Sequence, residues 1–357
     1  MRPETPDLRH KTCYETDIMA ITKRLNQARS RMKILVTGGA GFIGSAFVRQ
    51  AVKRGYKIIV IDKLTYAGDL ERLRDAQKKY KFYRADICNK KLIELIFKKE
   101  RPQIVVHFGA ETHVDRSIVD ASPFIETNIK GTQILADASI KHKIKKFIHT
   151  STDEVYGEII KGKFSEGASL KPNSPYAASK AAGDLLINAY IRTYNFPAII
   201  VRPCNNYGPW QYPEKLIPLA ILKILRNQKV PVYAKGENIR EWLYVEDCAK
   251  GIMQILQKGR VGQIYNLGSN EESENIEVVK AILKILHASE NMIGFVKDRP
   301  GHDIRYRLDS QKIYQEINWR PEIKFEEGIK FTVQWCFKHR NWLFSKWKDI
   351  AKLYKCN

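Results

Sequence analysis

A glycine-rich turn joins a short apolar run to an amphipathic segment just after Met32, and few folds place these features in that order. The run Lys33–Thr37 predicts a buried strand, residues 45–53 predict a helix, and the segment 38–44 between them contains four glycines. Glycine permits a tight turn and close approach of the backbone to a ligand. Because the N–H groups at a helix start favour negative charge, this stretch predicts a pyrophosphate site.

An acidic residue follows the next predicted strand, at a spacing from the glycine turn that is typical of dinucleotide-binding proteins. The strand 57–61 ends at Asp62, which lies 18 residues after Gly44. An acid at about this offset binds the ribose hydroxyls of a dinucleotide, and it would repel a ribose phosphate. The sequence therefore predicts NAD in preference to NADP, although Lys63 beside Asp62 weakens that preference slightly.

Short apolar runs and amphipathic segments continue to alternate as far as residue 202. This alternation predicts the α/β class, with a doubly wound parallel sheet of the Rossmann type and a smaller C-terminal substrate-binding domain. The ligands of such sheets bind at the carboxyl ends of the strands. The further strands that we expect are 81–85, 103–108, 146–150 and 198–202, with helices at 90–98 and 124–138.

Two of these strand ends are expected to lie beside the cofactor. Asp86 and Ile87 follow the strand 81–85 and would flank the adenine, and the segment 108–112 would lie along the dinucleotide. From spacing alone, Asp86 is equally well interpreted as a helix cap before Asn89.

A tyrosine and a lysine stand four residues apart in an alanine-rich run. Tyr176 and Lys180 would share one face of a helix. A positive charge near a phenol stabilises the phenolate and lowers the pKa, so the tyrosine can take a proton from an alcohol. Taken alone, such a pair is more often a surface pair on a helix than a catalytic couple.

Two adjacent carboxylates follow the strand 146–150. Thr152, Asp153 and Glu154 would lie at its carboxyl end. Elimination of water beside a carbonyl needs a base for the acidified proton and an acid for the departing hydroxyl, and two carboxyl groups can divide these roles. The alternative interpretation of this stretch is a solvated turn or a helix N-cap.

The chain is less regular after residue 203, which suits a smaller domain that closes over a ligand. Lys215 and Arg240 are candidates for binding a diphosphate, and the alternative is that both are ordinary surface cations. The domains that we expect are an extension at 1–31, which is dispensable, a mainly NAD-binding domain at 32–203, a mainly substrate-binding domain at 204–342 with Rossmann elements interleaved, and a tail at 343–357.

Composition excludes several classes of protein. No apolar run reaches membrane-spanning length, and no secretion signal is present. The six cysteines form no C-x-x-C pair and the eight histidines no H-E-x-x-H motif, so we expect no metal site and a reducing cytoplasm. The net charge of +22 is spread along the chain, which favours small anionic ligands and argues against nucleic acid as a partner.

From Met32 to about Trp342 the chain resembles the dTDP-glucose 4,6-dehydratases, a family of extended short-chain dehydrogenases/reductases. The motifs that carry the resemblance are Thr-Gly-Gly-Ala-Gly-Phe-Ile-Gly-Ser (37–45), Asp-Lys-Leu-Thr-Tyr-Ala-Gly (62–68), Glu-Thr-His-Val-Asp-Arg-Ser (111–117), Thr-Asn-Ile (127–129), Thr-Asp-Glu-Val-Tyr-Gly (152–157), Tyr-x-x-x-Lys (176–180), Asn-Asn-Tyr-Gly-Pro (205–209), Pro-Glu-Lys-Leu-Ile-Pro (213–218) and Arg-Pro-Gly-His-Asp (299–303).

Within that superfamily, the residues after the fifth strand distinguish dTDP-glucose dehydratases from epimerases and from GDP-mannose dehydratases. Epimerases lack the Asp-Glu couple and GDP-mannose dehydratases usually read Thr-Ser-Glu there. The resemblance implies that Tyr176 deprotonates the C4 hydroxyl of the sugar with help from Thr152 and Lys180, while hydride passes to NAD. It further implies that Glu154 removes the C5 proton, that Asp153 protonates the leaving C6 hydroxyl, and that hydride then returns to C6.

The glycine loop, the strand ends and the resemblance together assign two sets of binding residues. The cofactor set is Gly38, Gly41, Phe42, Ile43, Gly44, Asp62, Lys63, Leu64, Thr65, Asp86, Ile87, Phe108, Gly109, Ala110, Thr112, Thr127, Tyr176, Lys180 and Asn206. The resemblance implies a substrate set of Thr112, Thr152, Asn205, Lys215, Leu216, Pro231, Tyr233, Arg240, Asn275, Arg299 and His302.

Three departures from the family pattern stand out. Gly109 replaces a common alanine, Glu241 replaces a common aspartate, and the link between Gly157 and Tyr176 is shorter than in many relatives. The shorter link leaves the choice between thymine and uracil open.

The leading hypothesis is an NAD-dependent lyase that acts on dTDP-glucose in deoxysugar biosynthesis, for example of rhamnose. The alternatives are a UDP-glucose 4,6-dehydratase, a UDP-sugar 4-epimerase or decarboxylase, and a regulator or nucleic-acid binder that retained the fold. The resemblance also implies a homodimer formed through the long helices after the fourth and fifth strands.

Overall fold

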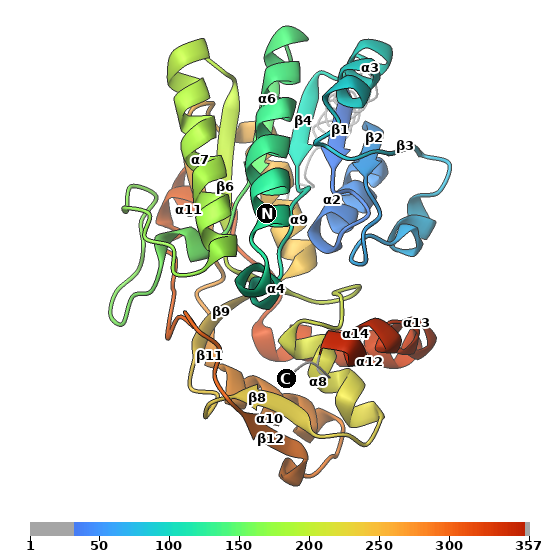
Figure 1. Ribbon diagram of the computed structural model, residues 1–357, viewed down its shortest axis with the longest axis vertical. Helices are drawn as coiled ribbons and strands as arrows, with labels where there is room; N and C mark the ends of the chain where they lie inside the picture. The colour runs from blue at the N-terminus through green and yellow to red at the C-terminus, as the bar shows by residue number, and fades with distance from the viewer. Residues whose placement is uncertain (1–31, 354–357) are drawn as a thin grey trace, which may run out of the picture.

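The computed structural model describes residues 32–353. The extension predicted for residues 1–31 and the last four residues, 354–357, lie outside the described residues. Across the described part the chain forms a large upper layer built on a parallel sheet and a smaller lower part (Figure 1).

A seven-stranded parallel sheet forms the centre of the upper layer. Its order is β10-β6-β5-β4-β1-β2-β3, and the first six strands in sequence follow the doubly wound order of a Rossmann fold. This confirms the predicted fold class. The strands are β1 (Lys33–Thr37), β2 (Lys57–Asp62), β3 (Tyr80–Arg84), β4 (Ile104–His107), β5 (Lys146–Thr150), β6 (Ala198–Pro203) and β10 (Ile264–Leu267).

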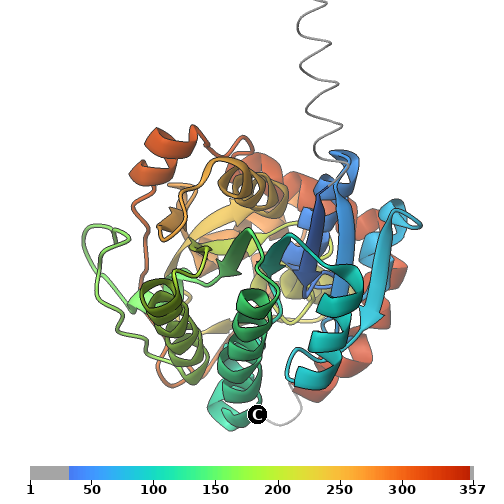
Figure 2. The same ribbon diagram turned by 90° about the horizontal axis from the view of Figure 1, so that it is seen from above.

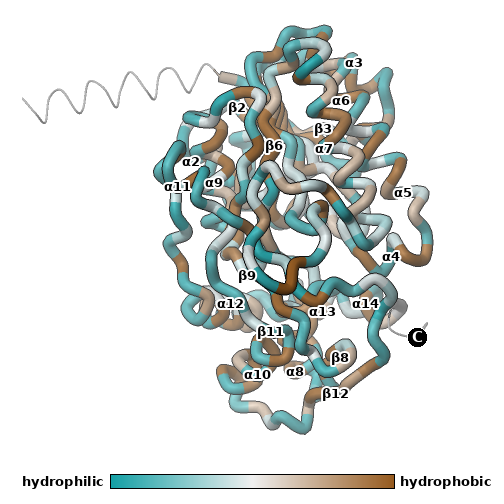
Figure 3. The backbone as a smooth tube through the Cα atoms, turned by 90° about the vertical axis from the view of Figure 1, so that its left-hand side faces the viewer, coloured by the Kyte–Doolittle hydropathy of each residue, from teal (hydrophilic) through white to brown (hydrophobic). Residues whose placement is uncertain are grey.

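Helices cover both faces of this sheet (Figure 2). One face packs against α2 (Phe42–Lys53), α9 (Val245–Lys258) and α11 (Gln311–Ile317). The other packs against α3 (Lys90–Glu100), α6 (Thr132–Lys141) and α7 (Pro175–Tyr194). Because neighbouring residues of a strand face opposite ways, Val36 enters one core and Leu35 the other. Buried strands such as β6 are accordingly hydrophobic over most of their length, Arg202 being the exception in β6 (Figure 3).

The boundaries of the strands in the first 203 residues agree with the sequence prediction to within one residue. The predicted helix 124–138 is wrong in detail. It begins earlier, as α5 (Ser122–Phe124), continues as the π-helical turn η2 (Ile125–Gly131), and ends later, as α6.

Short elements build the lower part. A three-stranded sheet contains β7 (Asn205–Tyr207), β9 (Ile239–Tyr244) and β11 (Glu272–Glu274), and a two-stranded sheet contains β8 (Val230–Tyr233) and β12 (Ile293–Val296). The helices α8 (Leu216–Leu225), α10 (Asn275–Ile285) and α12 (Phe325–Lys338) bury a separate apolar core with these strands. The remaining elements are η1 (Leu70–Ala76), α4 (Val114–Val119), η3 (Asp153–Tyr156), η4 (Glu290–Met292), α13 (Arg340–Ser345) and α14 (Trp347–Leu353).

The chain passes repeatedly between the two parts. After β7 to β9 it returns through α9, and β10 then pairs with β6 at the edge of the large sheet. The C-terminal region also packs, since Leu343 and Ile350 are buried and both Trp342 and Lys346 bond to Asp69 in the upper part. Within residues 32–353, no helix has the length and apolar character needed to cross a membrane.

Candidate active site

A cleft of about 300 Å³ opens at the carboxyl ends of β1, β2, β4 and β5. The residues that we predicted for the cofactor line this cleft, with one exception. Leu64 lies off the cleft and has a positive φ of 55°, and its N–H donates to Asp62 at 2.8 Å. The cleft also receives the predicted substrate residues Thr152, Asn205 and Lys215.

The glycine loop between β1 and α2 has no room for side chains. A Cβ at Gly44 would lie 2.2 Å from the carbonyl oxygen of Gly38, and Gly38 itself has a φ of 66°. At the start of α2, Gly41 provides no side-chain cap. The N–H groups of the first turn therefore face the cleft without competition from a side chain, which suits a pyrophosphate.

Asp62 at the end of β2 is held in place by backbone groups. Its two oxygens accept from the N–H of Ala40 at 2.9 Å and of Leu64 at 2.8 Å. The neighbouring Lys63 forms an ion pair with Asp86 at 2.7 Å, so its charge is directed away from Asp62. This arrangement fits the ribose hydroxyls of NAD.

Asp86 does not cap the helix that follows it, which settles the alternative left open by the sequence. Asn89 caps α3 by accepting from the N–H of Leu92 at 3.1 Å. Asp86 instead lines the cleft and accepts from the N–H of Cys88 at 2.9 Å.

The π-helical turn η2 is linked by hydrogen bonds to the segment after β4 and to helix α7. Asn128 in η2 accepts from the N–H of Glu111 at 2.9 Å and donates to its carbonyl at 3.0 Å. The same amide donates to Ser179 of α7 at 2.8 Å. A single buried side chain thus fixes the edge of the cleft relative to α7.

Tyr176 and Lys180 lie on the first turns of α7, both buried beside the cleft. Ser174 caps the helix by accepting from the N–H of Ala177, and Ser117 accepts from the N–H of Tyr176 at 3.1 Å. Lys180 donates to the carbonyl of Thr150 at 2.7 Å.

The electrostatics of Tyr176 differ from the simple expectation for a Tyr-Lys pair. Burial, and then the negative charge of Glu154, raise the pKa of Tyr176, while a hydrogen bond with Thr152 opposes the rise. Burial lowers the pKa of Lys180 to about 8. The sequence predicted a lowered tyrosine pKa because it gave no measure of how deeply the phenol is buried.

Thr152 joins the two carboxylates that follow β5. It caps the short helix η3 by accepting from the N–H of Glu154 at 3.3 Å, and it donates to Asp153 at 3.1 Å. The helix N-cap that the sequence allowed as an alternative for this stretch is therefore provided by Thr152. Asp153 is 2% exposed and lines the cleft beside Glu154.

The two carboxylates have different surroundings. Burial raises the pKa of Asp153 well above its ordinary value, and the charges of Glu154 and Glu241 raise it further. Burial also raises the pKa of Glu154, but the cations Arg299, Lys215 and Arg240 all act to lower it. Asp153 is thus the better proton donor, and Glu154 the better proton acceptor.

Arg240 is not a surface cation. It is 3% exposed, its guanidinium lies 4.2 Å from the ring centre of Tyr306, and it donates to the carbonyls of Ile239, Asp303 and Ile304. Lys215 reaches back to the upper part and donates to the carbonyl of Thr112 at 3.0 Å. The surface interpretation is therefore wrong for Arg240.

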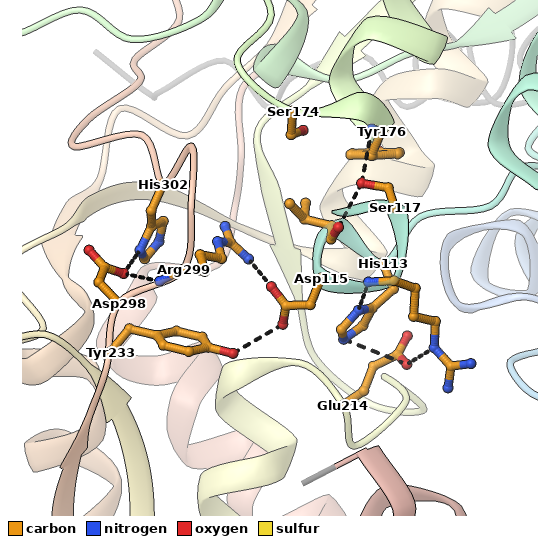
Figure 4. Close-up of polar contacts among 12 residues, drawn as sticks. His113, Asp115, Ser117, Ser174, Tyr176, Glu214, Tyr233, Asp298, Arg299 and His302 are labelled. Carbon is orange, nitrogen blue, oxygen red and sulfur yellow. Dashed lines mark hydrogen bonds and ion pairs between the residues drawn. The ribbon is translucent and has the colours of Figure 1, made fainter. Parts of the chain in front are cut away.

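The remaining predicted substrate residues lie on the lower part and do not line the cleft. Tyr233, Arg299 and His302 gather opposite α4 (Figure 4). Leu216 begins α8, Pro231 lies in β8 and Asn275 begins α10. Their roles stay predictions.

Several residues of the cleft escaped the sequence analysis. Arg72 is 1% exposed and donates to the carbonyls of Ala40, Ala67 and Trp210, and it lacked any motif that could have revealed it. Glu214 belongs to the Pro-Glu-Lys-Leu-Ile-Pro motif, which was noted, but its own burial was not foreseen. Across residues 32–353, no cluster of three side chains suited to a metal ion occurs.

Comparison with known proteins agrees with this geometry. Residues 35–332 match the family described as GDP-mannose 4,6 dehydratase. The dTDP-glucose 4,6-dehydratase of Actinoplanes sp. is 47% identical over 320 residues, which cover 87% of this chain and 99% of that protein. The crystal structure of DesIV, a dTDP-glucose 4,6-dehydratase from Streptomyces venezuelae with NAD bound, is 45% identical with a TM-score of 0.85, covering 87% of this chain and 98% of that one.

An epimerase with the same fold is more distant. The UDP-glucose 4-epimerase of Thermotoga maritima is 31% identical with a TM-score of 0.82, covering 86% of this chain and 99% of that one. The identity to dehydratases over nearly their whole length, together with the Asp153-Glu154 pair, shows that the chain belongs to the dTDP-glucose 4,6-dehydratase family of the extended short-chain dehydrogenases/reductases.

Proposed function

We propose that the chain is an NAD-dependent lyase that converts dTDP-glucose to dTDP-4-keto-6-deoxyglucose and water. The observation that carries this proposal is that Asp153, which is buried, and Glu154, which is partly buried, line the cleft beside Tyr176, because the elimination of water requires an acid and a base in addition to the oxidising couple. The activity named for the relatives supports the same reaction.

The cleft offers NAD its usual contacts. The glycine loop and the start of α2 would hold the pyrophosphate, and Asp62 would bind the adenosine ribose. When bound, NAD supplies the oxidising equivalent at C4 of the sugar and the reducing equivalent at C6.

Tyr176 is assigned to the proton of the C4 hydroxyl. Thr152 lies beside it and would share a hydrogen bond with the same hydroxyl. With a pKa of about 8, Lys180 is largely charged at neutral pH, and this charge favours the phenolate.

Glu154 and Asp153 are assigned to the elimination. Once C4 is a ketone, the C5 proton is acidic, and Glu154 would remove it under the influence of the nearby cations. Asp153, whose raised pKa keeps it protonated, would give its proton to the departing C6 hydroxyl, which leaves as water.

The proposal is tested by incubating the purified protein with dTDP-glucose and measuring the alkaline absorbance of a 4-keto-6-deoxy sugar. We expect product without net accumulation of NADH, and none from the Asp153→Asn, Glu154→Gln double variant. UDP-glucose, assayed in parallel, tests the nucleobase of the substrate. If UDP-glucose alone were converted, the dehydratase reaction would stand and the assignment of thymine as the nucleobase would be wrong.

The runner-up in this fold is a 4-epimerase or decarboxylase acting on a UDP-sugar. The observation in its favour is the similarity of the fold to UDP-glucose 4-epimerase. A C4 epimer or a decarboxylated sugar as the product would replace the dehydratase proposal with this one.

Further observations support proposals for the cellular location, the oligomeric state and the pathway of the enzyme. The four described cysteines Cys88, Cys204, Cys248 and Cys336 are free, which supports a cytoplasmic location. Exposed Leu185 and Tyr194 on α7 support a homodimer through the helices after β4 and β5. A 4-keto-6-deoxy product suits the biosynthesis of a deoxysugar such as rhamnose.

A further inference from the structure

One of the contacts between the short helix α4 of the upper part and the lower part is made by a carboxylate of α4. Asp115 uses both of its oxygens, since Oδ1 accepts from Arg299 at 3.1 Å and Oδ2 accepts from the hydroxyl of Tyr233 at 3.1 Å (Figure 4). These partners lie 184 and 118 residues away in the sequence. A single side chain therefore fixes two groups that belong to different segments of the lower part.

The two groups that Asp115 holds are also in contact with each other. The guanidinium of Arg299 lies 6.0 Å from the ring centre of Tyr233, and the ring of His302 meets that of Tyr233 edge to face at 5.8 Å. All three are residues predicted to bind the substrate. Asp115 thus supports two members of the group directly, and His302 packs against one of them, Tyr233.

Arg299 retains hydrogen-bonding capacity that Asp115 does not use. Asp115 bonds to one terminal nitrogen, while Nε of Arg299 is buried and has no hydrogen-bond partner. Its charge also acts on Glu154, whose pKa it helps to lower. Arg299 therefore acts on the proposed base and bonds to Asp115, with a donor left for an anionic ligand.

The ionic state of Asp115 suits a supporting role. Burial opposes its ionisation, but the charge of Arg299 and the bonds from Arg299 and Tyr233 hold the pKa of Asp115 below its ordinary value. An arginine that is already held by a carboxylate loses less freedom when it binds a ligand.

We propose that Asp115 is a positioning residue, which orients Arg299 and Tyr233 to receive the nucleotide end of the substrate. The inference rests on the proposed function for the identity of the ligand, a thymidine diphosphate. Asp115 acts through Arg299, so it contributes to substrate binding and leaves the chemistry at C4, C5 and C6 to other residues.

The test measures the binding of dTDP to the NAD-loaded protein by calorimetry, together with kcat and KM for dTDP-glucose. We expect Asp115→Asn to weaken dTDP binding about tenfold and to raise KM similarly, with kcat within about threefold of wild type. Asp115→Glu should recover part of the affinity. Asp120→Asn, an exposed carboxylate that ends the same helix, serves as the matched control.

A double-mutant cycle separates positioning from a general structural role. The loss of dTDP affinity in the Asp115→Asn, Arg299→Gln variant should be smaller than the sum of the two single losses, because part of the effect of the carboxylate passes through the arginine. NAD affinity and thermal stability should stay near wild type in Asp115→Asn.

Three results would overturn the inference: additive losses in the cycle, unchanged dTDP affinity in Asp115→Asn, or a fall in kcat without a change in affinity. A wild-type protein that fails to bind dTDP would overturn it as well. A wild-type protein that binds dTDP but forms no product from dTDP-glucose would refute the proposed function alone, because the binding cycle can still be completed.

Discussion

Asp153 and Glu154 are neighbours in sequence, and burial raises the pKa of both, but the charges around them differ. Glu154 and Glu241 raise the pKa of Asp153 further, Arg299 and Lys215 act to lower the pKa of Glu154, and Arg240 acts to lower both. The sequence predicted the pair and its division of roles, but apart from Glu154 itself these charges come from residues that are distant in the sequence. Such long-range surroundings have no signature in the local sequence.

Replacement of Asp153 by asparagine should separate activity from stability. Loss of the proton donor is expected to lower kcat by about 10²–10⁴-fold. Since burial raises the folded-state pKa of Asp153, the folded protein holds a proton that the unfolded chain releases above about pH 4. The free energy of unfolding of the wild type therefore falls as pH rises from about 4 toward the pKa of Asp153 in the folded protein. Asparagine does not ionise, so the free energy of unfolding of Asp153→Asn should not fall in this way.

Melting temperatures of wild type and Asp153→Asn, measured from about pH 5 to about pH 8, check this expectation. The variant should gain stability relative to wild type as pH rises, while the exposed Asp75→Asn control follows wild type. A difference in stability between the variant and wild type that stays constant over this pH range would contradict the assigned protonation of Asp153.

Lys180 should give the enzyme a pH limit on the alkaline side. In the proposed reaction its charge favours the phenolate of Tyr176, and burial lowers the pKa of Lys180 to about 8. Below that pH the charge is present and above it the charge is lost, so kcat/KM should fall as pH rises through about 8. In Lys180→Arg, which stays charged, the fall should disappear even if the rate is lower. If kcat/KM fell at the same pH in both proteins, the titrating group would be one other than Lys180.

At the scale of the element, the π-helical turn η2 shows what a hydrophobic pattern omits. Apolar periodicity predicted a helix for this region, and a helix is present. The wide turn depends instead on Asn128, whose partners Glu111 and Ser179 lie in other elements. A pattern that reports which residues are buried cannot report which distant groups they bond.

Truncation of Asn128 tests the structural importance of that turn. Asn128→Ala would leave the backbone groups of Glu111 without partners, so we expect a loss of about 2–4 kcal/mol in the free energy of unfolding. Denaturant titration measures the loss, and Gln133→Ala, an exposed site on α6, is the control. NAD affinity should also fall, since Glu111 and Thr127 line the cleft. Unchanged stability would show that water replaces the amide.

At the scale of the whole molecule, the first half of the chain was the easier half to predict. Its strands and glycine loop are local patterns, and they gave the sheet, the cofactor cleft and its lining residues. The lower part was harder because its strands are short and its predicted substrate residues meet only through tertiary contacts, as Tyr233 and Arg299 do. Here the family motifs suggested residues that periodicity could not.

The proposed dimer predicts a response to charge on α7. Leu185 is 60% exposed on this helix, and a glutamate there would be buried without a partner if a second copy covered it. We expect Leu185→Glu to shift the protein toward monomers in analytical ultracentrifugation. Phe295→Glu provides a matched control, since Phe295 is 62% exposed on β12, which belongs to the lower part and not to the helices after β4 and β5. A monomeric wild type, or equal effects of both changes, would reject this interface.

The return of the chain through α9 and β10 also bears on synthesis at the ribosome. The face of α2 is covered by α9, which is made some 200 positions later, and the edge of β6 is paired by β10, which is made some 60 positions later. A nascent chain that ends near residue 203 has an uncovered apolar face and an open sheet edge. Translation must therefore proceed well past the glycine loop and the catalytic helix before either gains its final support, and the half-made enzyme depends on protection from aggregation in the meantime.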